Sequence, residues 1–344
     1  MDGPQRNEGL SNPLMDEEGR LRSAWRLLVQ YLSYRIVAAL LVNLGAVAWL
    51  LAFVGLDVLS PGGRSISALI GFPALSLISN LSSAAAALLT VWLAGRLLDR
   101  RPFRDFGFWL DGDWWLDLGF GIALGALLMT GIFLAQLALG WVKVTGTFET
   151  AGGQSSTPFA LAILLPLAGF VCVGVAEETV FRGYQLRNAA EGLGALLGPR
   201  AAIFTAWTLS SLFFGALHAS NPSATLLSTA NIVLAGIMLG TGYVLTGQLA
   251  IPIGLHIAWN FFQGNVFGFP VSGYGQVGAS FISTGQHGPG MWTGDAFGPE
   301  GGLLATVAIL VGCLLISAWV RLRQGSASFH TPLAKPPQRN SPTG

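Results

Sequence analysis

The sequence predicts an all-α polytopic membrane protein with about eight transmembrane helices and a polar cavity inside the membrane. Of the 344 residues, 52% are hydrophobic and 10% are charged, whereas about 25% charged residues are usual in a soluble domain. The mean hydropathy is +0.59. Long apolar runs recur between short polar segments, as repeated crossings of a hydrocarbon layer about 30 Å thick require.

Eight apolar segments are long enough for a membrane span. In chain order they cover about 30–55, 66–95, 117–142, 158–190, 200–219, 226–246, 251–268 and 303–321. The fourth begins with a helix start signal, because Ser156-Thr157 supplies an N-cap and Pro158 suits the first helical position. Its helical pattern ends at glycines and a proline between 192 and 199.

The remaining segments are polar. We expect residues 1–27 to form a mobile N-terminal segment, 28–322 to form the membrane domain, and the Pro- and Ser-rich tail 323–344 to be disordered. Two internal segments are predicted as loops, namely 143–157 and the Gly-, Ser- and Thr-rich stretch 269–302, whose role stays open.

The distribution of positive charge predicts the orientation. The loop after the second span carries Arg96, Arg100, Arg101 and Arg104, and it falls on the same side as both chain ends. Because lysine and arginine accumulate in cytoplasmic loops, we expect both termini in the cytoplasm.

Several function classes are disfavoured. A net charge of +1 gives no case for nucleic acid binding. Cys172 and Cys313 both lie in apolar runs and cannot build a disulfide framework or a metal cluster. The chain has no HExxH and no GxSxG motif, and no internal repeat of the kind found in many transporters. The pairs Gly121/Gly125 and Gly236/Gly240 are typical of close helix packing.

Two adjacent carboxylates, Glu177 and Glu178, end the apolar run of the fourth span. One acidic residue at the centre of a membrane helix costs roughly 2.5–3.5 kcal/mol, so a functional role is the default interpretation. Glu178 and Arg182 are spaced i, i+4 and share a helix face, whereas Glu177 points about 100° away. One glutamate is then neutralised, and the other faces a cavity as a general base. A salt bridge at a helix end, without chemistry, is the alternative.

Polar residues also occur in two later spans. His218 follows Phe214 by four residues, and Asn260 follows His256 by four, so each pair shares a helix face. His287 and His330 lie outside the spans, and we expect both to be solvated.

Three short motifs now stand in order along the chain: Glu177-Glu178-x-x-x-Arg182, Phe214-x-x-x-His218 and His256-x-x-x-Asn260. Together they resemble the ordered motifs of the CAAX prenyl endopeptidase and bacteriocin-processing family (CPBP, or Abi), whose members are intramembrane endopeptidases. The resemblance covers roughly 170–265, about a quarter of the chain. The eight predicted spans are also similar to those of the family's prenyl-protein proteases.

The resemblance implies hydrolysis of a peptide bond inside the membrane. Glu177 is assigned as general base, His218 as the group that holds the water, and His256 with Asn260 as donors to the oxyanion. Glu178 with Arg182 is expected to orient Glu177, and Phe214 is a supporting residue. The expected partners are the lipid bilayer and a peptide or membrane-protein substrate, with or without a prenyl group, which a cavity open to the cytoplasmic side would admit together with water.

Alternatives stay open. No cofactor is assigned, but Glu177, His218 and His256 would supply three zinc ligands in a metalloprotease. A non-enzymatic regulator or immunity-type protein of the same fold, and a proton-coupled transporter, are the competing functions. A straight sixth span would separate the two histidines by roughly 15 Å in depth at a rise of about 1.5 Å per residue. We therefore expect that span to be short, tilted or broken, or its boundaries to differ.

Overall fold

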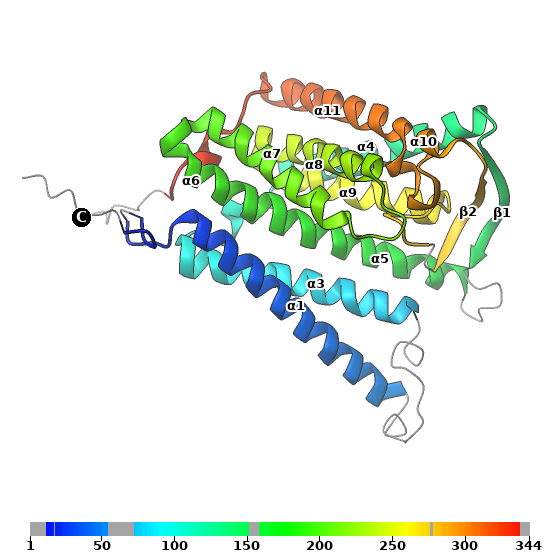
Figure 1. Cartoon of the computed structure of the whole chain (residues 1–344), viewed down its shortest axis with the longest axis horizontal. Helices are drawn as coiled ribbons and strands as arrows, with labels where there is room; N and C mark the ends of the chain where they lie inside the picture. The colour runs from blue at the N-terminus through cyan, green and yellow to red at the C-terminus, as the bar shows by residue number, and fades with distance from the viewer. Residues whose placement is uncertain (1–11, 17, 54–71, 151–157, 276–277, 338–344) are drawn as a thin grey trace, which may run out of the picture.

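Seven helical segments of the described chain are long and apolar enough to cross a membrane. The computed structural model describes residues 12–16, 18–53, 72–150, 158–275 and 278–337. The axes of the long helices run in roughly the same direction (Figure 1). They are α1 (Ser23–Phe53), α3 (Phe72–Ala94), α4 (Gly112–Ala138), α5 (Phe159–Glu178), which continues through α6 (Arg187–Leu197), α7 (Pro199–His218), α8 (Leu226–Thr246) and α11 (Leu303–Gln324). This arrangement confirms the all-α polytopic fold.

The predicted seventh span is a shorter, central helix. It corresponds to α9 (Ala250–Phe261), which has 12 residues and continues into a π-helical turn, η5 (Phe262–Val266). Ten of its 12 residues are buried. Because neighbouring helices surround α9, its residues face protein and not lipid.

Glycines bring α4 and α9 into close contact. A Cβ atom at Gly121 would lie 2.4 Å from the carbonyl oxygen of Ile251, and one at Gly125 would lie 2.6 Å from that of Leu255. On the other helix, a Cβ at Gly254 would lie 2.3 Å from the carbonyl oxygen of Leu118. The predicted packing role of Gly121 and Gly125 is therefore confirmed, and it fixes the helix that carries His256.

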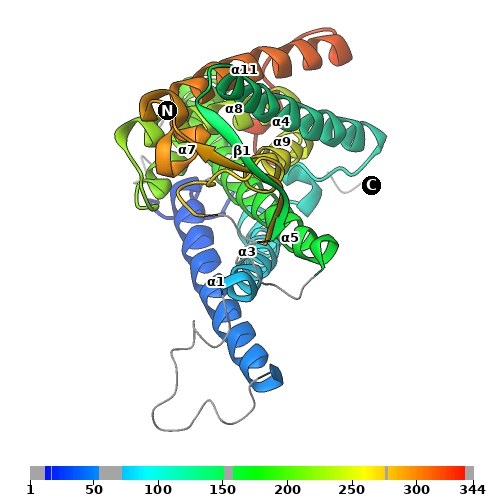
Figure 2. The same cartoon turned by 90° about the vertical axis from the view of Figure 1, so that its right-hand side faces the viewer.

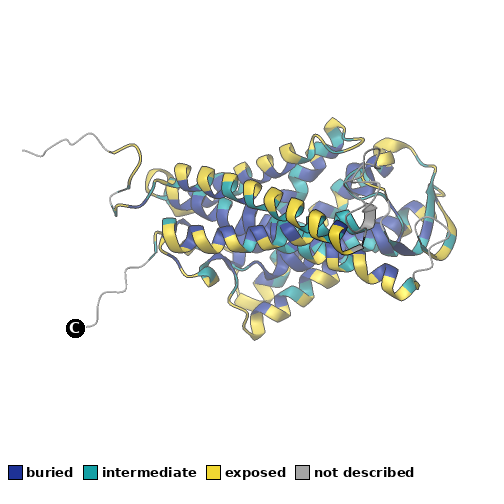
Figure 3. Cartoon of the chain, turned by 90° about the horizontal axis from the view of Figure 1, so that it is seen from below, coloured by how far each residue is buried: buried dark blue, intermediate teal, exposed yellow. Residues whose placement is uncertain are grey.

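The hairpin of α1 and α3 projects from the rest of the bundle (Figures 1 and 2). Only 11% of the most apolar window of α1 is buried. Exposed residues follow the outer faces of the helices (Figure 3), and many large hydrophobic residues, above all leucines, are among them. Such a surface suits contact with lipid tails.

Two segments predicted as loops pair as strands. Strand β1 (Val142–Thr150) runs antiparallel to β2 (Ala279–Gln286), with Val142 opposite Gln286 and Thr150 opposite Ala279. The prediction of loops is wrong here, because the two strands lie far apart in the sequence and their pairing leaves no local pattern. The sheet lies at the end of the bundle opposite the chain ends (Figure 1). Beyond β2 follow α10 (Gly290–Thr293), η6 (Asp295–Phe297) and η7 (Pro299–Gly301).

Charged residues hold the other end of the bundle together. Glu191 accepts ion pairs from Arg20 and Arg26, both at 2.9 Å, and from Arg101 at 2.6 Å. Arg26 also pairs with Asp99 at 2.5 Å. We call these five residues the terminal ion cluster. It corrects the prediction of a mobile segment for residues 18–27, because α1 begins at Ser23 and both Arg20 and Arg26 are buried, whereas residues 1–11 and 17 lie outside the described residues.

The tail is ordered over its described part. Residues after α11 lead into a 3₁₀ turn, η8 (Thr331–Ala334), whose Leu333 is fully buried. The amide of His330 donates to the carbonyl oxygen of Val244, and Arg101 donates to that of Lys335. The predicted disorder is wrong up to residue 337, and 338–344 lie outside the described residues. His330 is only partly exposed, because it packs against the end of α8 at Gly247.

Candidate active site

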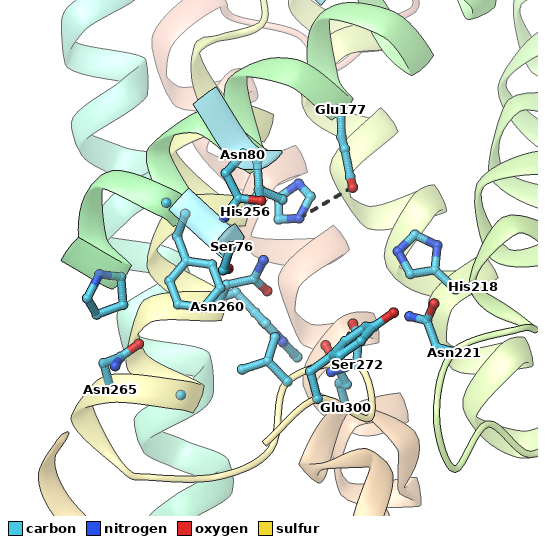
Figure 4. A pocket seen from close by; sticks show the side chains of 18 of the residues that line it. Ser76, Asn80, Glu177, His218, Asn221, His256, Asn260, Asn265, Ser272 and Glu300 are labelled. Atoms are coloured by element: carbon cyan, nitrogen blue, oxygen red, sulfur yellow. Dashed lines mark hydrogen bonds and ion pairs between the residues drawn. The ribbon is translucent and has the colours of Figure 1, made fainter. Parts of the chain in front are cut away.

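A cavity of about 520 Å³ lies between α3, α5, α7, α8, α9 and the segment that follows α9. Four residues assigned as catalytic from the sequence line it, namely Glu177, His218, His256 and Asn260. Figure 4 shows them on three helices around one space. The fold therefore brings these four residues, which lie far apart in the sequence, to one cavity.

Glu177 presents an unpartnered carboxylate oxygen to this cavity. Its Oε2 is buried and has no hydrogen-bond partner, and it lies 3.9 Å from Nε2 of His256 (Figure 4). A separation above about 3.5 Å between two polar atoms is the distance at which a bridging water fits.

Glu178 is bonded to other side chains, unlike the free oxygen of Glu177. Its Oε1 accepts one hydrogen bond from Nη1 of Arg182 at 2.9 Å and another from Nδ1 of His256 at 2.8 Å. The predicted pair of Glu178 and Arg182 is confirmed. That this pair orients Glu177 stays a prediction, and the carboxylate of Glu178 also fixes the ring of His256.

Arg182 joins three of the helices. It is 1% exposed, its guanidinium lies 4.4 Å above the ring of Phe214, and Nη2 donates to the carbonyl oxygen of Gly236 at 3.3 Å. Arg182 lies in the π-helical segment η4 (Thr179–Leu186), which begins directly after Glu177 and Glu178. Such π-helical turns inside α-helices occur frequently at functional sites.

The two histidines share one aromatic neighbour. The ring of Phe214 lies 4.6 Å from that of His218 and 6.3 Å from that of His256, measured between centroids. The expected break in the sixth span is absent, since α8 is continuous from Leu226 to Thr246. His218 and His256 nevertheless line the same cavity. Phe214, one turn before His218, packs against the rings of both.

Hydrogen bonds fix the tautomer of His218. Its Nδ1 lies 2.8 Å from the carbonyl oxygen of Phe214, which accepts only, so Nδ1 carries the proton. In the neutral ring, Nε2 is then an acceptor. The same argument applies to His256, where Nδ1 donates to Glu178 and Nε2 faces Glu177.

Asn260 completes the set. It lies one turn after His256 on α9, is 8% exposed and lines the cavity (Figure 4). Its side-chain amide offers two donors, which is what a developing oxyanion needs.

A comparison with protein families matches residues 159–262 to the model described as type II CAAX prenyl endopeptidase Rce1-like. This part of the chain is similar to that family, and we refer to the matched residues as the Rce1-like domain. The matched family is a family of proteases, and it confirms the resemblance drawn from the three motifs, all of which fall within the match. No curated protein and no solved structure matches the chain.

Some cavity residues lie outside the Rce1-like domain, and the sequence motifs did not reveal them. Polar members of the lining that were missed are Ser76, Asn80, Asn221, Asn265, Ser272 and Glu300. Only Asn221 among them lies between the ends of the family match. The one signal in the sequence that could have pointed to Glu300 was its charge, since Asp295 and Glu300 are the acidic residues of the stretch 269–302.

Glu300 is buried in this lining. The amide and hydroxyl of Ser272 both donate to its Oε1, the hydroxyl at 2.9 Å. Burial raises the pKa of Glu300 above its ordinary value, although the hydrogen bonds of Ser272 and the charge of His218 act in the opposite direction.

The residues do not fit a zinc site in this arrangement. Within the described part of the chain, no three His, Cys, Asp or Glu side chains are grouped so that they could hold a metal ion. The zinc alternative therefore gains no support from the geometry, and the steps proposed below use only side chains and water.

Proposed function

We propose that the chain is an intramembrane endopeptidase in which Glu177 activates a water molecule for attack on a peptide bond. The observation that carries this proposal is the free Oε2 of Glu177, which faces Nε2 of His256 at 3.9 Å in a polar cavity between membrane helices. The match to a protease family supports it.

The first step is attack of water on the scissile carbonyl carbon. Glu177 takes one proton from the water, and Nε2 of His218 accepts a hydrogen bond from it, which orients the nucleophile. General base catalysis of this kind contributes about 10²- to 10⁴-fold. The new C–O bond converts the carbonyl oxygen into an oxyanion.

The oxyanion requires donors. Asn260 offers its side-chain amide, and His256 donates from Nε2 when its ring carries a second proton. Removing one such donor costs about 10²- to 10³-fold in rate. The C–N bond then breaks, and protonated Glu177 returns its proton to the leaving amine.

The substrate in this proposal is a peptide or a membrane-protein segment, prenylated or not, that enters from the bilayer. The arginines of the terminal ion cluster and of the adjacent loop lie at the end with both chain termini. By the positive-inside rule we place this end in the cytoplasm.

The test is cleavage of a quenched fluorescent peptide library, prenylated and unprenylated, by the detergent-purified chain. Glu177→Gln should abolish cleavage, whereas Glu149→Gln, an exposed carboxylate on β1, should leave it unchanged. Cleavage that persists with chelator supports the glutamate-activated water. Loss with chelator and recovery with zinc would establish the metalloprotease. A well-folded chain that cleaves no peptide would favour a non-enzymatic regulator.

A further inference from the structure

Glu300 is a buried carboxylate without a paired cation among the described residues. It is 6% exposed, and its side chain accepts hydrogen bonds from Ser272 and Gln263, both of which are uncharged. Three of the other buried carboxylates differ, because Glu178, Glu191 and Asp99 each have an arginine nitrogen at 2.9 Å or less. Asp117 also accepts from an uncharged donor, the indole of Trp319, but it does not line the cavity. An uncompensated carboxylate is costly to bury, so its retention in a cavity needs a reason.

The cavity around Glu300 is acidic. Of the described residues that line it, Glu177 and Glu300 carry carboxylates, and none is a lysine or an arginine. Figure 4 places Glu300 and Ser272 across the space from Glu177, near Asn221. A second anion placed here, such as the free carboxyl terminus of a peptide, would be repelled by both glutamates. A cation would be attracted.

We propose that Glu300 binds a cationic group of the substrate, either the side chain of a lysine or arginine or a free amino terminus, and thereby sets substrate preference. The proposal rests on the proposed function in taking this cavity as the peptide-binding site. Glu300 and Ser272 belong to a segment outside the Rce1-like domain, so this preference is separable from the hydrolytic residues.

Two further features support this role. Burial raises the pKa of Glu300, and a bound cation would favour its ionised form and so offset the cost of burial. Ser272 holds Oε1 through both its amide and its hydroxyl, which fixes the carboxyl group in one position. A buried carboxylate that is fixed in position binds a cation more tightly than a mobile surface carboxylate does.

The test measures peptide binding, so that it does not depend on turnover. The full chain with Glu177→Gln is titrated in detergent with fluorescent peptides, in which one lysine replaces norleucine at each position in turn. We expect lysine at one position to bind about 10- to 100-fold more tightly than norleucine, as for a hydrogen bond to a charged group. A peptide with a free and one with an acetylated amino terminus distinguish the two sources of the cation.

Two further variants assign the effect. Adding Glu300→Gln should reduce the preference to near unity, and it keeps an oxygen acceptor for Ser272, so folding is retained. Asp295→Asn is the matched control, because it removes the same charge from an exposed site in the same segment, and asparagine tolerates the φ of 51° found there. It should leave the preference unchanged.

The outcomes separate this inference from the proposed function. Equal binding of all peptides at every position, no binding of any, or a cation preference that survives Glu300→Gln would each overturn the role of Glu300. Hydrolysis of neutral peptides by the chain with Glu177 intact is measured in parallel. Hydrolysis without cation preference overturns this inference alone, and cation preference without hydrolysis overturns the proposed function alone.

Discussion

The carboxylate of Glu178 lies 2.8 Å from Nδ1 of His256, although the two residues are 78 positions apart in the chain. The same oxygen pairs with Arg182 at 2.9 Å. Glu178 therefore connects the helix of the two glutamates to the central helix α9, and it fixes the ring whose other nitrogen faces Glu177.

Replacing Glu178 with alanine should destabilise the protein strongly. The change leaves Arg182 as an unpaired charge at 1% exposure, and breaking a buried pair in this way costs about 3–5 kcal/mol. The unfolding midpoint in detergent measures the effect, with Glu149→Ala on the exposed strand β1 as control. Equal midpoints for the two variants would contradict the connecting role of Glu178.

Glu177→Gln should behave in the opposite way, with activity lost and stability kept or raised. Its Oε2 has no hydrogen-bond partner, so the amide sacrifices no contact of the folded state. A cost in stability at a functional residue is a common price of activity. Cleavage rate and unfolding midpoint are measured on the same preparations. A midpoint that falls as far as in Glu178→Ala would show that Glu177 serves the fold.

Gly125→Ala should displace α9 and with it His256. The new Cβ would lie 2.6 Å from the carbonyl oxygen of Leu255, where backbone must move, and overpacking of this kind costs about 1–3 kcal/mol. Gly119→Ala on the same helix is the matched control, because the new Cβ would lie in open space. Replacing this flexible glycine inside a helix should stabilise the protein by about 0.5–1 kcal/mol. Both midpoints shifting in the same direction would refute the close contact.

His330 should make stability depend on pH. Its pKa is lowered by burial and by the positive charge of Arg187, so the ring is neutral in the fold at pH values where the unfolded chain is already protonated. The unfolded state then binds more protons, and stability falls as the pH drops below the ordinary value of 6.5 towards the lowered one. Unfolding midpoints from pH 5 to 7.5 should show a smaller slope for His330→Asn. An unchanged slope would argue against this burial.

Local sequence patterns predicted most of the fold. Long apolar runs marked the helices because each must satisfy its own backbone groups in lipid, and α8 begins and ends where the pattern placed it. The pair of Glu178 and Arg182 followed from the spacing of one helical turn. The glycine pairs of α4 likewise showed where another helix packs.

Contacts between distant segments were not visible in these patterns. The strands β1 and β2, the bond from Glu178 to His256, and the position of Glu300 in the cavity each join segments far apart in the sequence. A single acidic residue in a glycine-rich stretch carries no periodic signal. The ordered tail was missed for the same reason, since its composition resembles that of a disordered segment and it is held by contacts with distant residues such as Val244 and Arg101.

The terminal ion cluster has a consequence for biosynthesis. Arg26 precedes Glu191 by 165 residues and Arg101 precedes it by 90, so the ribosome delivers the arginines first. At 5–20 residues per second, translating the stretch from Arg101 to Glu191 takes roughly 10 s. During that interval the hairpin of α1 and α3 has no carboxylate from α6 to dock on. The hairpin therefore makes its contact with α6 later than the contact between its own two helices.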